Sequence, residues 1–125
     1  MALEIGITSH KPAERRVTLR GRLDTLTTPQ LERELAALLD APGVTSLVFQ
    51  LEGLEYISSA GLRCVIQANR ALANRGGQVV LISPQATVRN VFDIVKALPP
   101  EQIFASEADF SAYLDAMPRQ GPGQP

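Results

Sequence analysis

Two short apolar runs constrain the fold more than any other feature of this sequence. One run holds Leu47, Val48, Phe49 and Leu51, and the other spans residues 79–82 with the sequence Val-Val-Leu-Ile. A run of strand length without polar alternation is typical of a parallel strand that is buried on both faces. Parallel strands need long crossover connections, which are usually helical and right-handed. The runs therefore predict an α/β fold.

Alternating patterns predict further strands before and after these runs. Residues 3–7 and residues 17–23 alternate apolar and polar side chains, which indicates two strands joined by a hairpin-like loop at residues 11–14. Ile103 and Phe104 can add a short fifth strand near the end. We therefore expect a mixed β-sheet of four to five strands.

Four segments place apolar side chains on one face at helical spacing, and we expect these helices to start near Thr28, Ser59, Ser83 and Ser106. Thr28 and Ser83 are each followed by proline, which is the pattern of an N-cap and a first helical residue. Ser106 and Asp109 have the spacing of a capping box. The predicted architecture is thus a sheet packed with about four α-helices.

Length and composition indicate one compact domain. The chain has 125 residues, of which 45% are hydrophobic and 20% are charged, enough to form one sizeable core. We assign residues 1–117 to this domain and expect the Pro- and Gly-rich residues 118–125 to be a disordered tail. The formal net charge is −1 and the arginines are scattered, so the sequence favours neither a nucleic acid nor a membrane as a partner. Proteins or small molecules are the expected partners.

The single cysteine, Cys64, cannot form an internal disulfide. It lies between apolar positions of a predicted helix, which favours a neutral core residue over a metal ligand or redox thiol. The sequence shows no signal peptide and no apolar segment of about 20 residues. We therefore expect a cytoplasmic protein.

A turn of small residues is the best candidate for a functional site. Ser58, Ser59, Ala60 and Gly61 lie between the predicted central strand and the next helix, so the chain can turn tightly and place Ser59 near the positive end of that helix. The residues alone also allow an ordinary turn with a serine N-cap. A catalytic serine is disfavoured, because the Gly-x-Ser-x-Gly pattern is absent and the only histidine is His10.

Asp24 is a second candidate, at the end of the second predicted strand. Both an ordinary turn aspartate and a role at a site remain open for it. The carboxyl ends of parallel strands meet at one edge of a sheet, where α/β proteins place their sites. Asp24 and the two serines should therefore lie at the same edge.

The motifs together resemble those of STAS domains and, within that family, of the anti-sigma factor antagonists (anti-anti-sigma factors). The resemblance covers roughly residues 3–114. It rests on Gly-Arg-Leu-Asp at residues 21–24, Tyr-Ile-Ser-Ser-Ala-Gly-Leu at residues 56–62, and Gly-Gly-Gln-Val-Val-Leu at residues 76–81 followed by Pro84 and by Val-Arg-Asn-Val-Phe-Asp at residues 88–93.

The resemblance implies a partner switch rather than an enzyme. An anti-sigma factor that is also a serine kinase binds the unmodified protein and releases it after phosphorylating a serine, which matches Ser59 here; a serine phosphatase is the expected third component. The family usually has an acidic residue before this serine, whereas this chain has Ser58. Asp24 matches an acidic residue that helps to position the partner.

The predicted partner surface consists of Asp24, Ser58, Ser59, Gly61 and Arg63. Arg63 belongs to it because it lies four residues after Ser59 and thus on the same side of the helix. Neither a cofactor nor a metal is expected. The same resemblance also allows an interaction module of a system without a sigma factor: a lipid-transport complex, a stress-signalling scaffold, or a phosphatase-controlled regulator of secretion or motility.

Overall fold

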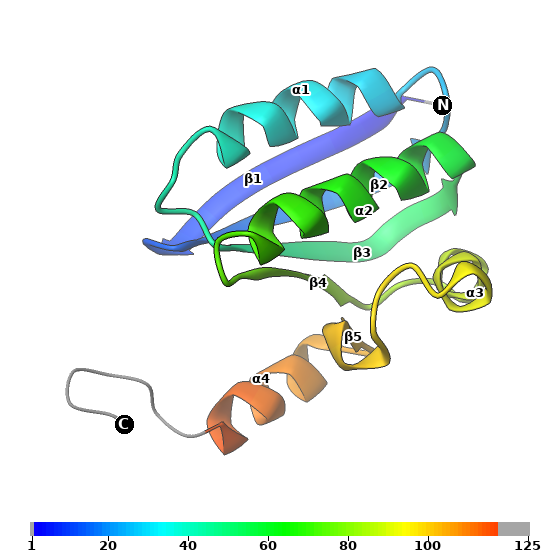
Figure 1. Ribbon diagram of the computed structural model, residues 1–125. Coiled ribbons are helices and arrows are strands. Elements are labelled where there is room, and N and C mark those ends of the chain that lie inside the picture. The colour runs from blue at the N-terminus through cyan, green and yellow to red at the C-terminus, as the bar shows by residue number, and fades with distance from the viewer. Residues whose placement is uncertain (1, 118–125) are drawn as a thin grey trace.

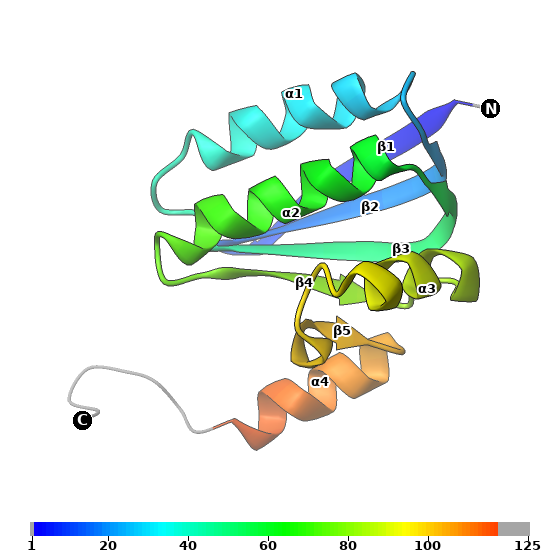
Figure 2. The same ribbon diagram turned by 45° about the vertical axis from the view of Figure 1, so that its right-hand side comes forward.

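A computed structural model describes residues 2–117 as a five-stranded mixed sheet with four α-helices (Figures 1 and 2). The strands are β1 (Leu3–Lys11), β2 (Glu14–Leu23), β3 (Ser46–Ile57), β4 (Gln78–Ile82) and β5 (Ile103–Phe104), and they lie in the sheet in the order of the sequence. β1 is antiparallel to β2, and the remaining neighbours are parallel. The predicted fold class is confirmed.

The helices cover the sheet on both sides. They are α1 (Thr28–Leu39), α2 (Ser59–Ala73), α3 (Ala86–Val95) and α4 (Glu107–Ala116), with a 3-10 turn at Pro100–Gln102. Both views show α1 and α2 side by side on one face, with α4 on the other side of the sheet beyond β4 (Figures 1 and 2). α3 packs near the end of β3, where the Thr87 hydroxyl donates to the Glu55 carbonyl oxygen at 3.3 Å.

Two core clusters explain why the apolar runs have no polar alternation. Leu47 and Phe49 face the helices α1 and α2 as part of the main cluster, whereas Val48 faces the opposite side with Val80 and Phe110 of α4. Each central strand is therefore buried on both faces, as the sequence predicted.

The helix starts agree with the predictions only in part. Ser106 is an N-cap, and its hydroxyl oxygen accepts a hydrogen bond from the Asp109 N–H at 3.1 Å. α1 begins at Thr28 itself, with Thr27 at the N-cap position. The prediction for Ser83 was wrong: α3 begins at Ala86 after Gln85. Ser83 instead has φ 57°.

Pairing at the end of the sheet accounts for the error at Ser83. The Ser83 N–H donates to the Phe104 carbonyl oxygen at 2.9 Å, so β5 holds the residue in line with the end of β4.

The predicted tail, residues 118–125, lies outside the described residues, and the assignment of residues 1–117 to one domain stays a prediction. None of the helices within residues 2–117 has the length and apolar character needed to cross a membrane.

Candidate functional site

β2 and β3 end side by side and bring the two predicted site segments together. Leu23 pairs with Ile57 in the parallel register, and the Ser58 N–H donates to the Leu23 carbonyl oxygen at 2.8 Å. Asp24 therefore follows one strand at the place where Ser58 follows its neighbour. The expectation that these residues share one sheet edge is confirmed.

The two serines differ in what their hydroxyl groups contact. Ser58 has an extended backbone and is the N-cap of α2, because its hydroxyl oxygen accepts a hydrogen bond from the Gly61 N–H at 3.2 Å. Ser59 is the first helical residue and is exposed. Among residues 2–117 no hydrogen bond engages the Ser59 hydroxyl. The serine turn thus carries one structural hydroxyl and one that faces solvent.

Gly61 allows the start of α2 to pack closely against the end of β2. It is buried, and a Cβ atom at this position would lie 2.6 Å from Cγ of the buried Leu23. Only a residue without a side chain therefore lets the start of α2 approach the end of β2 so closely. The structure places Gly61 under the predicted partner surface, and its role there is to set the position of the serines.

Asp24 folds the loop between β2 and α1. Its Oδ1 accepts hydrogen bonds from the backbone N–H groups of Leu26 and Thr27, both at 3.0 Å. The Asp24 N–H in turn donates to the Thr27 hydroxyl oxygen at 2.9 Å. The hydrogen bond from the Thr27 backbone N–H is the main cause that lowers the pKa of the Asp24 carboxyl. Of the two interpretations that the sequence left open, the structure shows the turn role directly.

The same loop carries a residue that the sequence analysis missed. Leu26 is 88% exposed, and it lies three residues after Leu23, whose carbonyl oxygen accepts the Ser58 N–H. A single leucine between two threonines gives no periodic signal, and only the fold of the loop reveals that it faces solvent.

Two arginines lie near the turn. Arg63 is exposed on α2 and, together with Thr25 and Ala60, lines a hollow of about 310 Å³ between the first turns of α1 and α2. The Arg22 guanidinium lies 4.2 Å from the centre of the Tyr56 ring, a cation–π contact near the ends of β2 and β3. Of the two, only Arg63 lies on α2, and Glu32 of α1 lines the same hollow, so the hollow holds one basic and one acidic side chain.

The structure places the only histidine far from the serines. His10 is near the end of β1, which is antiparallel to β2, so it lies by the turn before Glu14 and at the opposite end of the hairpin from Asp24. Neither serine therefore has an imidazole neighbour that could act as a general base.

Cys64 is a core residue with 5% of its surface exposed, and burial raises the pKa of its thiol to about 11. It is therefore a neutral thiol at pH 7, as predicted. Within residues 2–117 no cluster of three or more His, Cys, Asp or Glu side chains could hold a metal ion.

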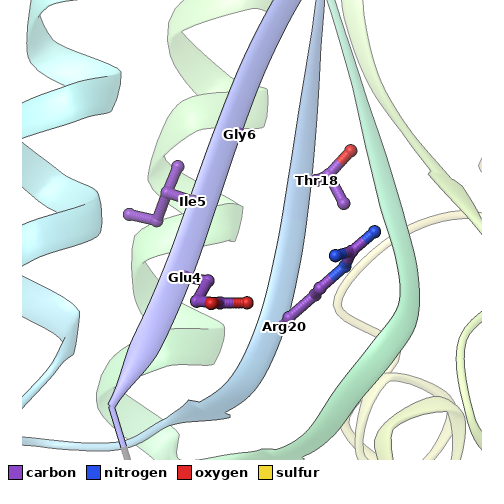
Figure 3. A pocket seen from close by; sticks show the side chains of 5 residues that line it. All are labelled: Glu4, Ile5, Gly6, Thr18 and Arg20. Carbon is purple, nitrogen blue, oxygen red and sulfur yellow. The ribbon is translucent and has the colours of Figure 1, made fainter.

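A second hollow, on β1 and β2, lacks the exposed serine and the helix N-terminus of the serine turn. Figure 3 shows Glu4, Thr18 and Arg20 around it, while Ile5 points to the other side of the sheet. Glu4 and Arg20 are cross-strand partners, so the hollow contains one acidic and one basic side chain on neighbouring strands. The site with distinct chemistry is the serine turn.

The fold and the turn define an α/β domain that presents an exposed serine at the start of a helix. The STAS domain family model matches residues 8–110. The chain belongs to the STAS domain family. A relative from Bordetella bronchiseptica, named "Putative anti-sigma factor antagonist BtrV", is 39% identical over 102 residues, which cover 81% of this chain and 87% of the relative.

Solved structures share this fold. The anti-sigma factor antagonist SpoIIAA in its unphosphorylated form has a TM-score of 0.77 and 20% identity, covering 93% of this chain and all (100%) of that one. The phosphorylated form of the Bacillus cell fate determinant SpoIIAA has a TM-score of 0.72 and 20% identity, covering 89% and 99% of the two chains.

Proposed function

We propose that this protein is an anti-sigma factor antagonist that binds an anti-sigma factor with serine kinase activity. Phosphorylation of Ser59 by that kinase inactivates it, and a serine phosphatase restores it. The name of the Bordetella relative supports the general role, and the resemblance of the motifs supports the partner switch.

The observation that carries the proposal is that Ser58 caps the helix whereas Ser59 is exposed to solvent. Ser59 directly follows Ser58, whose N–H donates to the carbonyl oxygen of Leu23, the residue before Asp24. A kinase can reach Ser59 without opening the helix. The Ser58 oxygen is already engaged by the Gly61 N–H, which makes it the poorer phosphate acceptor.

The electrostatics of the helix start explain how a phosphate could change binding without unfolding the domain. The first turn of α2 contains no acidic residue, and the positive end of a helix favours an anion. A phosphate adds about −1.5 to −2 charge at pH 7. The fold therefore tolerates the charge, while a partner that docks over Ser59 meets a changed surface.

The test is capture of the partner by purified protein variants. We expect Ser59→Ala to capture a kinase-type anti-sigma factor from lysate of the native cell and to remain bound in ATP, because it cannot be modified. Ser59→Asp should bind more weakly. The captured kinase is then made recombinantly, and phosphopeptide mapping after incubation with ATP should place the phosphate on Ser59.

Ser58→Ala is the matched control for the neighbouring hydroxyl. It should still be phosphorylated at Ser59. Phosphate confined to Ser58, or equal binding of wild type, Ser59→Ala and Ser59→Asp, would refute the switch. Capture of a partner complex that contains no sigma-directed component would instead favour a STAS module of another system.

A further inference from the structure

The exposed Leu26 side chain lies on a loop that is held in place on several sides. Besides the two hydrogen bonds that Asp24 Oδ1 accepts, the Thr28 N–H and the Thr28 hydroxyl both donate to the Asp24 carbonyl oxygen, at 2.9 and 2.6 Å. Thr28 is itself buried. Hydrogen bonds thus hold the loop from Asp24 to Thr28 in one conformation, and Leu26 extends from it into solvent.

This loop borders the serine turn directly. Thr25 lines the same hollow as Ala60 and Arg63 of α2, and Asp24 follows the strand residue that accepts the Ser58 N–H. Leu26 therefore stands beside the surface on which a kinase must dock to reach Ser59.

We infer that Leu26 is the apolar anchor of the docking surface and inserts into an apolar pocket of the anti-sigma partner, with Asp24 as the positioning residue that presents it. The inference rests on the proposed function and deepens it. An apolar side chain on a preformed loop gains affinity when it is buried, at little cost in lost conformational freedom. Asp24 acts through the loop, because its Oδ1 already accepts the Leu26 and Thr27 N–H groups.

The first test measures binding of the purified recombinant anti-sigma kinase by titration calorimetry. We expect Leu26→Ser to weaken binding about ten- to hundredfold and Leu26→Met to stay within about threefold of wild type. Leu114→Ser is the matched control: Leu114 has 38% exposure on α4, which both views place away from the start of α2 (Figures 1 and 2). It should bind as wild type does.

The second test separates positioning from direct charge contact. Asp24→Asn keeps an oxygen that can accept the loop N–H groups but removes the charge, so binding should stay within about threefold of wild type. Asp24→Ala removes the acceptor and should weaken binding as much as Leu26→Ser does. The double variant Asp24→Ala with Leu26→Ser should be no weaker than either single variant, because both act through one contact.

Each result supports or overturns the inference. Unchanged binding by Leu26→Ser, or equal losses from Leu26→Ser and Leu114→Ser, would overturn the anchor while leaving the proposed function intact. Equal losses from Asp24→Asn and Asp24→Ala would show that the charge contacts the partner and would overturn the positioning role. If the wild-type chain binds no kinase, the proposed function and the inference both fail.

Discussion

Ser58 occupies the position where the family resemblance implies an acidic residue, and its hydroxyl explains why the exchange is tolerated. An N-cap needs a side-chain oxygen for the helix N–H groups, and serine, aspartate and asparagine supply it about equally well. Here the oxygen accepts the Gly61 N–H. Serine therefore keeps the cap but leaves the start of α2 without the negative charge that an aspartate would place beside Ser59.

This role predicts the stability of two variants at Ser58. Ser58→Ala should lower the free energy of unfolding by about 1 kcal/mol, because the Gly61 N–H loses its partner. Ser58→Asp should be at least as stable as wild type, since an anion at a helix N-terminus is favourable. Urea denaturation at pH 7 measures both. A loss from Ser58→Asp equal to that from Ser58→Ala would contradict the capping role.

Cys64 gives a pH-dependent prediction. Burial raises the pKa of its thiol to about 11, so at pH 8 only a small fraction of the native protein carries the reactive thiolate. Labelling with a disulfide reagent should therefore be slow at pH 8 and accelerate with each pH unit toward pH 11, whereas urea-unfolded chain should react rapidly at pH 8. Equal rates for native and unfolded chain at pH 8 would show that the thiol is accessible.

The same thiol makes the stability depend on pH in one direction. Because its folded pKa lies above the unfolded value, folding keeps the thiol protonated. The contribution of the thiol to the free energy of unfolding is complete below its unfolded pKa. It is lost as the pH rises from the unfolded pKa through the folded pKa of about 11.

The sequence predicted the position of the site residues at one sheet edge better than it predicted the role of each residue. Sequence spacing placed Asp24 and the serines together, because each follows a strand of a parallel pair. It could not separate the capping hydroxyl of Ser58 from the exposed hydroxyl of Ser59, or show that Asp24 folds its own loop. Those distinctions depend on backbone angles and on hydrogen bonds, which a pattern of residue types does not contain.

At the scale of elements, the approach of α2 to the sheet depends on Gly61. Gly61→Ala should lower the free energy of unfolding by about 1 to 3 kcal/mol, because the new methyl group overlaps Leu23. Gly43→Ala is the control, since nothing lies within 4 Å of a Cβ there, and we expect a change within about 0.5 kcal/mol. Thermal unfolding of both variants measures the difference. Equal stability would mean that α2 moves to accommodate the methyl group.

The length of β3 shows which part of an element local sequence can predict. The apolar run predicted the strand around residues 47–51, but β3 continues to Ile57. Its second half pairs with β2, and α3 supports it, because Gln85 Nε2 donates to the Glu52 carbonyl oxygen at 2.8 Å and the Thr87 hydroxyl donates to that of Glu55 at 3.3 Å. These partners are about 30 residues away in the sequence, so the apolar run alone did not reveal that the strand continues to Ile57.

For the molecule as a whole, α4 closes the face of the sheet opposite α1 and α2. Phe110 packs against Val48 and Val80, and Glu107 forms an ion pair with Arg16 of β2 at 2.6 Å. The Arg16 hydrogen bond is the main cause that lowers the pKa of the Glu107 carboxyl. The buried Phe110 and the partly exposed ion pair are thus two attachments of the helix, and Tyr113 adds a ring contact with Phe104 while Gln50 donates to Glu107.

These two attachments predict unequal losses of stability. Phe110→Ala should lower the free energy of unfolding by about 3 kcal/mol, because it uncovers the small apolar cluster under α4. Glu107→Gln should cost only about 0 to 1 kcal/mol, since Glu107 is half-exposed. Its effect should be present at neutral pH and disappear as the pH falls through the folded pKa of Glu107, because the folded pKa lies below the ordinary glutamate value. Denaturant unfolding at pH 7 and at acid pH tests both variants. A larger loss from Glu107→Gln than from Phe110→Ala would mean that the ion pair, rather than apolar burial, holds α4 on the sheet.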